Sequence, residues 1–152
     1  MVNDKLLMFP DKRMVGFLRK HHVMTLATCC DNMPWCCQCF YVYVDHLQGL
    51  VFTSDQTTRH IVQAMQQPCV AGSIVLESNV VGKLQGIQLE GILMEAEGEL
   101  LSEIRTAYLK RFPFAIMMNT TLWFLKLTSM KMTDNRLGFG KKLHWTNDST
   151  DV

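Results

Sequence analysis

One nine-residue segment, Phe52–His60, gathers side chains that suit an anion. It places hydroxyl groups at Thr53, Ser54 and Thr58 around a turn and a cation, Arg59, at a helix start. Exposed backbone N–H groups, hydroxyls and a forked guanidinium are the groups that bind a phosphate. An arginine at the positive end of a helix is unfavourable by up to about 1 kcal/mol unless an anion lies beside it. The segment therefore indicates a phosphate site, with an ordinary helix cap and solvated side chains as the alternative.

Six cysteines are the second group with reactive chemistry, and five of them fall between Cys29 and Cys39. Cys36 and Cys39 have the C-x-x-C spacing of zinc sites. Residues 34–44 have the composition of a β-strand, however, in which residues three apart point to opposite faces. We therefore expect reduced thiols that pack as small hydrophobic side chains, and no metal site.

Composition limits the classes of partner. The 152 residues carry 15 basic and 14 acidic side chains, a balance that argues against a general nucleic-acid binder. The longest apolar stretch, residues 69–76, is far shorter than the roughly 18 residues of a membrane span. Residues 1–13 lack an apolar core followed by a small-residue cleavage site. We expect one soluble, cytoplasmic domain over residues 1–152, without a nucleic-acid or membrane partner.

The secondary-structure elements around the candidate phosphate-binding residues are predicted to be mainly β-strands. Polar turns link the first three predicted strands, which implies hairpins in series and an antiparallel sheet. Gly86 and Gly91 inside one predicted strand indicate a bend, a bulge or a close approach. The pattern favours a small antiparallel barrel with flanking helices. The predicted strands are 23–30, 35–44, 50–53, 69–76, 84–97 and 121–133, and the predicted helices are 10–22, 58–67 and 99–111.

Thr53 and Ser54, followed by the triplet 58–60, resemble the strand–turn–helix phosphate signature of the FMN-binding split barrels, the pyridoxamine 5′-phosphate oxidase-like group. In that group a Thr or Ser near the strand end and a Ser/Thr-Arg-Lys triplet hold the flavin phosphate. This chain has His60 in place of the lysine. Further segments resemble the small, functionally uncharacterised YhbP-like bacterial branch of the group, so that the resemblance covers nearly the whole length. These segments are Gly86–Gln88 with Gly91, Arg111–Pro113, Thr133–Asn135 and Leu137–Lys142.

The resemblance implies a six-stranded antiparallel split β-barrel that forms a homodimer, with FMN in the groove between the subunits. Gln85 and Gln88 would reach the isoalloxazine or the ribityl chain. Lys141 or Lys142 would reach the partner's site, unless both lysines belong to a solvated basic turn. The residues implied at the phosphate are Thr53, Ser54, Thr58, Arg59 and His60.

Three functions follow from these observations. The first is an FMN-dependent oxidoreductase of an unknown small-molecule substrate, in which the cofactor supplies the chemistry and catalytic residues are unknown. The chain lacks the Arg/His-rich C-terminal pattern that binds pyridoxamine phosphate in the true oxidases of the group, so we expect no vitamin B6 oxidation. The second is a non-catalytic flavin- or haem-binding module. The third is a degenerate barrel whose role is to bind other proteins. Axial ligands for a haem would come from His21, His22, His46, His60 or His144.

Overall fold

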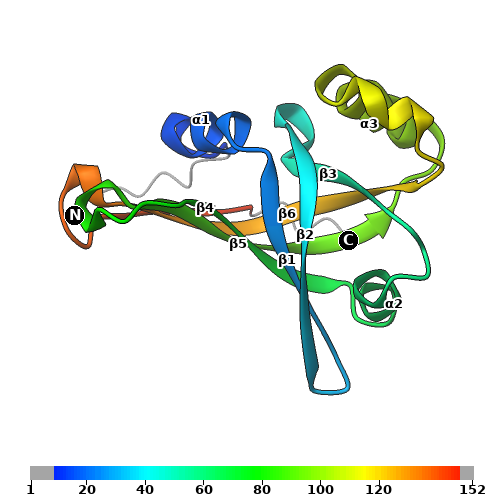
Figure 1. Cartoon of the computed structure of the whole chain (residues 1–152), viewed down its shortest axis with the longest axis horizontal. Helices are drawn as coiled ribbons and strands as arrows, with labels where there is room; N and C mark the ends of the chain where they lie inside the picture. The colour runs from blue at the N-terminus through cyan, green and yellow to red at the C-terminus, as the bar shows by residue number, and fades with distance from the viewer. Residues whose placement is uncertain (1–8, 148–152) are drawn as a thin grey trace.

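The computed structural model describes residues 9–147, which form a twisted sheet closed into a barrel, with helices packed around it (Figure 1). No helix in this range is long and apolar enough to cross a membrane. Residues 1–8, part of the segment considered for a signal peptide, lie outside the described range. The helices are α1 (Lys12–Lys20), α2 (Arg59–Gln66) and α3 (Gly98–Arg111). The strands are β1 (Val23–Cys30), β2 (Met33–Val44), β3 (Gly49–Ser54), β4 (Cys69–Leu76), β5 (Gln85–Glu95), β6 (Thr121–Asp134) and β7 (Lys142–Thr146).

Strand pairing confirms the six-stranded antiparallel barrel. The strands are hydrogen-bonded in the order β3–β2–β1–β4–β5–β6, and β3 also pairs with β6, which closes the ring. β7 pairs with the far end of β6 as a seventh strand that the sequence did not predict. Only Leu143 and Trp145 are apolar in β7, too few for its alternation to be recognised.

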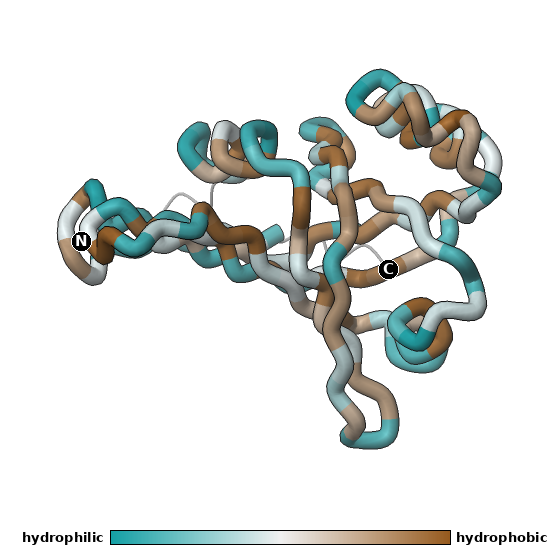
Figure 2. Tube along the Cα trace, viewed as in Figure 1, coloured by the Kyte–Doolittle hydropathy of each residue, from teal (hydrophilic) through white to brown (hydrophobic). Residues whose placement is uncertain are grey.

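The core lies inside the barrel, where the strands are mainly hydrophobic, whereas the turns are mainly hydrophilic (Figure 2). Trp123, Tyr41 and Phe52 are its largest fully buried side chains. α2 contributes Ile61 and Ala64 to the same cluster, which fixes the start of this helix against the barrel. A second cluster packs α3 onto the outside of β2, β3 and β6, and it includes the buried Tyr108.

Gly91 produces one of the irregularities expected from the sequence. The register between β5 and β6 shifts between Glu90 and Gly91. A Cβ atom at Gly91 would lie 2.4 Å from the carbonyl oxygen of Lys126. Only glycine therefore allows the two backbones to approach this closely at the bulge, which helps the sheet to curl into a barrel.

The burial expected for the cysteines is wrong for most of them. Only Cys39 is buried, whereas Cys29, Cys36 and Cys69 are exposed and the other two are intermediate. The β1–β2 hairpin extends beyond the body of the barrel (Figure 1), so the side chains near its tip leave the core. The apolar composition of this segment therefore does not report burial within one chain.

Candidate functional site

The five predicted phosphate residues lie together where β3 ends and α2 begins. β3 ends at Ser54, Thr58 is the N-cap of α2, and Arg59 opens the helix. The loop is shaped by Asp55, whose Oδ1 accepts hydrogen bonds from the Thr57 N–H at 2.7 Å and the Thr57 hydroxyl at 2.6 Å. An aspartate that bonds the backbone two residues later is a common way to form such a turn.

His60 joins two of the hydroxyl groups. Its Nε2 lies 2.7 Å from Ser54 Oγ and 3.2 Å from Thr58 Oγ1, and the two hydroxyl oxygens are 3.2 Å apart. Burial lowers the pKa of His60 below its ordinary value, which keeps the imidazole neutral near pH 7. His60 therefore orients the hydroxyl groups at neutral pH and does not add the positive charge of a lysine.

At the start of α2, the first-turn backbone N–H groups and the Arg59 guanidinium have no side-chain acceptor among the described residues. Thr58 Oγ1 donates to the carbonyl oxygen of Asp55 at 2.8 Å and makes no capping bond to a first-turn N–H, and that turn holds no acidic residue. No ion pair formed within residues 9–147 includes Arg59. The Arg59 guanidinium instead lies over the Trp35 ring, 4.2 Å from its centroid. This arrangement offers uncapped N–H groups, hydroxyls and a cation to an anion.

A groove of about 650 Å³ adjoins the turn between β2, α3 and the short 3-10 helix Pro113–Met117. Thr53 belongs to both features, because it lines the groove and its Oγ1 lies 3.4 Å from the hydroxyl of Tyr108. The aromatic rings of Phe40 and Phe112, which contact each other edge to face, line the same groove. The groove can therefore accept a planar apolar group beside the anion-binding turn.

The other predicted cofactor residues lie elsewhere in the chain. Gln85 is buried at the opposite end of β5, paired with Asp134, and Gln88 is exposed in the same half of the strand. The near end of β5 is Glu95, which accepts a hydrogen bond from Gln56 of the turn. Seven residues of strand, about 23 Å, separate Gln88 from Glu95. Within one chain these glutamines do not meet the phosphate candidates.

Lys141 also lies away from the turn. It is exposed and immediately precedes β7, which pairs with the far end of β6. Its N–H donates to the carbonyl oxygen of Gly138. Within one chain Lys141 is therefore part of a tight basic turn at the opposite end of the sheet from Arg59.

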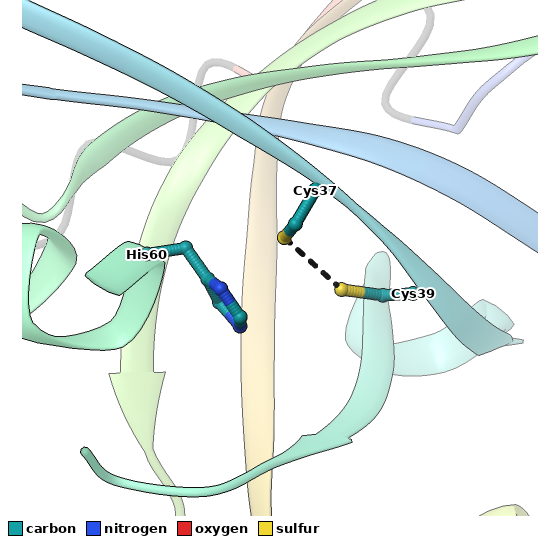
Figure 3. A group of neighbouring side chains, drawn as sticks. All are labelled: Cys37, Cys39 and His60. Atoms are coloured by element: carbon teal, nitrogen blue, oxygen red, sulfur yellow. Dashed lines mark hydrogen bonds between the residues drawn. The ribbon is translucent and has the colours of Figure 1, made fainter. Parts of the chain in front are cut away.

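A group of possible metal ligands lies next to His60 and was missed in the sequence. The side chains of Cys37 and Cys39 converge with the His60 ring (Figure 3). The two sulfur atoms are 3.7 Å apart, and they and one ring nitrogen all lie within 4.8 Å of one another. The C-x-x-C spacing in the sequence pairs Cys36 with Cys39 instead. The two-residue spacing of Cys37 and Cys39 on a strand would have placed both on one face, but only the fold brings His60 there.

Sequence comparison places the chain among uncharacterised bacterial proteins. No protein-family model matches it. A UPF0306 protein of Yersinia pseudotuberculosis serotype O:3 is 38% identical over 130 residues, which cover 86% of this chain and 88% of that protein. A UPF0306 protein of Yersinia pestis, strain Angola, matches with the same identity and coverage.

Solved structures confirm the split-barrel fold. A haem-binding protein from Mycobacterium smegmatis has a TM-score of 0.74 at 20% identity, covering 91% of this chain and 59% of that one. An FAD-binding protein from Mesorhizobium loti has a TM-score of 0.65 at 13% identity, covering 79% and 91%. A Listeria innocua protein described as a candidate pyridoxamine 5′-phosphate oxidase has a TM-score of 0.62 at 12% identity, covering 80% and 96%. The chain thus spans about three fifths of the mycobacterial protein.

Proposed function

The chain belongs to the UPF0306 family, and we propose that it is an FMN-binding protein whose β3–α2 turn holds the flavin phosphate. The observation that carries this proposal is the uncompensated positive end of α2. Arg59 has no carboxylate partner within residues 9–147, and the first-turn N–H groups are left uncapped by Thr58. A phosphate would accept hydrogen bonds from these groups and from the Ser54 hydroxyl, and from the Thr58 hydroxyl in exchange for its bond to the carbonyl oxygen of Asp55.

The groove beside Thr53 is the proposed place of the isoalloxazine ring. Its volume of about 650 Å³ lies within the range of about 300–1,000 Å³ that is usual for small-molecule sites. Phe40, Phe112 and Phe114 supply apolar contacts, and Gln38 and Arg111 supply polar ones. For one chain this makes Gln38 a better candidate for the ring than Gln85 or Gln88.

We further propose that a homodimer completes the cofactor site. Beside the groove the 3-10 helix exposes large apolar side chains, with Phe114 and Met117 each 86% exposed and Ile116 76% exposed. Contiguous exposed apolar surface of this kind marks an interface more often than an isolated side chain does. A second copy is also the means by which Gln85, Gln88 or Lys141 would reach a site from which they lie distant in one chain.

The reaction class that suits such a site is electron transfer between the flavin and a small molecule. FMN supplies the redox chemistry when bound, and the described residues supply binding and orientation. The alternative is a non-catalytic flavin module with the same site. Reduction of the bound flavin by a nicotinamide donor, followed by reoxidation by an added acceptor over many cycles, would favour the enzyme. Flavin that binds but does not turn over with a panel of donors would favour the module.

Haem is the second candidate ligand, because the mycobacterial protein with the same fold is described as haem-binding. A spectrum of the freshly purified protein separates the two ligands, since haem gives a Soret band and flavin does not. Among the candidate axial ligands, His60 adjoins the groove through Cys39, whereas His46 pairs with Glu103 on the surface. A Soret band that is lost in His60→Ala would therefore replace the flavin proposal.

The decisive experiment compares FMN with riboflavin, which lacks the phosphate. We expect the protein to prefer FMN, and Arg59→Ala to weaken FMN binding about 10- to 100-fold while leaving riboflavin binding unchanged. This range corresponds to the loss of a charged hydrogen-bonded contact of about 1.5–3 kcal/mol. Dissociation constants from flavin fluorescence quenching measure both ligands.

Arg19→Ala is the matched control, because Arg19 is an exposed helix arginine whose partner is Asp45. It should leave both flavin affinities unchanged. Equal losses of affinity for FMN and for riboflavin in Arg59→Ala would overturn the assignment of the phosphate site. A wild-type protein that binds neither flavin would overturn the proposed function and leave the protein-interaction barrel in its place.

A further inference from the structure

We propose that Cys37, Cys39 and His60 form a binding site for a thiophilic metal ion, with Zn²⁺ as the expected occupant. The proposal goes beyond the flavin function and does not depend on it. Soft thiolate sulfur and imidazole nitrogen are the ligands that zinc prefers. All three donors lie within 4.8 Å of one another (Figure 3).

The separation of the sulfur atoms already suits a tetrahedral ion. Two sulfurs bonded at about 2.3 Å to a tetrahedral zinc ion lie about 3.8 Å apart. Cys37 Sγ and Cys39 Sγ are 3.7 Å apart. The corresponding sulfur–nitrogen edge is about 3.5 Å, so the His60 ring must approach the sulfurs by at most about 1.3 Å. Two residues of β2 and one of α2 thus form most of the site without a change in the backbone.

The surroundings of the three donors favour an ion over a solvated thiol pair. Cys39 is 7% exposed, and Cys37 and His60 are half-buried. The His60 ring is held in place by the contact of its Nε2 with Ser54 Oγ at 2.7 Å. The site is therefore largely shielded, and its mobile ligand is already restrained.

The chemistry of binding balances without an oxidant or a reductant. The two thiol groups form a hydrogen bond to each other, with their sulfur atoms 3.7 Å apart. On binding, Zn²⁺ replaces the two thiol protons, which pass to the buffer. Three protein ligands leave a fourth position for water or another small ligand, as in zinc sites that are open to exchange.

Cys36 provides an internal control because it differs from Cys37 by one position on the same strand. Successive side chains of a strand point to opposite faces, and Cys36 is exposed whereas Cys39 is buried. Cys36→Ser removes a thiol next to the proposed site without removing a ligand. Cys37→Ser removes a half-buried ligand and spares the buried Cys39, whose loss would disturb the core.

The experiment titrates Co²⁺ into the reduced, metal-free and flavin-free full chain under exclusion of oxygen, and then adds Zn²⁺. We expect one Co²⁺ per chain, with thiolate-to-metal charge-transfer absorption and the intense d–d bands of four-coordinate cobalt, and displacement by Zn²⁺. Cys37→Ser should lose about half of the charge-transfer intensity and bind at least 10- to 100-fold more weakly, since even the loss of a supporting contact costs that much. Cys36→Ser should match the wild type.

Two further readouts keep the result interpretable. Circular dichroism of each metal-free variant shows whether it is folded, and Arg59→Ala should bind Co²⁺ like the wild type even though it loses its preference for FMN. Failure of the flavin proposal therefore leaves this test intact. Absence of charge-transfer absorption in the reduced wild type would overturn the metal site. An unchanged spectrum in folded Cys37→Ser, or an equal loss in Cys36→Ser, would overturn it as well.

Discussion

Arg59 and Arg136 lie near opposite ends of β6, and their surroundings differ. Arg136 follows the last residue of the strand, Asp134, and its guanidinium donates to both carboxylate oxygens, at 3.0 and 2.8 Å. Arg59 lies near the first residues of β6, because Ser54 pairs with Thr121. It forms none of the ion pairs found within residues 9–147 and stacks on Trp35.

The difference separates a structural charge from a charge available to a ligand. Asp134 is 3% exposed and also accepts the backbone N–H of Arg136, so its carboxylate caps the short 3-10 helix Asn135–Leu137. Its polar groups are satisfied within the fold. At the turn from β3 to α2, by contrast, the first-turn N–H groups are uncapped and Arg59 forms none of the ion pairs within residues 9–147. Changes at the first place should alter folding stability, and changes at the second should alter binding.

The largest effect on stability is expected from Asp134→Ala. This change leaves the Arg136 N–H and guanidinium without their buried acceptor, and the loss should lower the free energy of unfolding by about 2 kcal/mol. Urea denaturation measures the change. FMN affinity, measured under conditions where the variant is folded, should stay within about twofold of the wild type. A tenfold loss of FMN affinity would show that the two ends of β6 do not act separately.

The contribution of Asp134 should also depend on pH. The hydrogen bond from Arg136 is the largest cause that lowers the pKa of Asp134. A carboxyl group whose pKa is lowered in the folded state stabilises the fold fully above its unfolded pKa of about 3.9, and this contribution is lost as the pH falls through the folded value. The stability difference between wild type and Asp134→Asn should be constant from pH 7 to 5 and smaller at pH 3. A difference that does not shrink at pH 3 would contradict the ion-pair explanation.

Local sequence patterns predicted most strands and helices, because secondary structure depends mainly on residues that are close in the sequence. β1 and β4 begin and end at the predicted residues, since the polar turn of Asp31 and Asn32 ends β1 and Pro68 directly precedes β4. The closure of β3 on β6 could not be derived from periodicity, because it joins Gly49–Ser54 to a strand about 70 residues away. The split-barrel resemblance supplied this pairing. β7 was missed because a five-residue strand has too short an alternation.

The candidate site was predictable only where it is contiguous in sequence. The hydroxyls and the cation of residues 53–60 belong to one turn, so local spacing brings them together. The neutral state of His60 depends on burial against other elements, which no local pattern reports. Cys37 and Cys39 share a face through strand alternation, but their meeting with His60 depends on how α2 packs against β2. Tertiary packing therefore determines both the charge of His60 and which cysteine side chains lie beside it.

Thr58→Ala should change FMN affinity more than stability, which is the opposite of the effect expected for Asp134→Ala. Loss of an N-cap threonine commonly costs about 1 kcal/mol, but Thr58 makes no capping bond here, so we expect a stability loss below about 0.5 kcal/mol. FMN binding should weaken about fivefold, which is the value of one neutral hydrogen bond. Thr106→Ala, in which the lost hydroxyl donates to Ser102 on α3, is the control for both measurements. A stability loss as large as that of an ordinary cap, with unchanged FMN affinity, would make Thr58 a structural residue.

The smallest effect is expected from Trp35→Ala. The Arg59 guanidinium carbon lies 4.2 Å from the centroid of the Trp35 ring, and this cation–π contact uses none of the N–H groups that could donate to a phosphate. The ring therefore restrains the cation before the ligand arrives, and its loss should weaken FMN binding about two- to fivefold, equivalent to about 0.5–1 kcal/mol for an exposed cation–π contact. Trp35→Phe, which keeps an aromatic face, should lose less. Tighter FMN binding in Trp35→Ala would mean that the ring withholds Arg59 from the anion, and the stacked position would then be an alternative to the binding position.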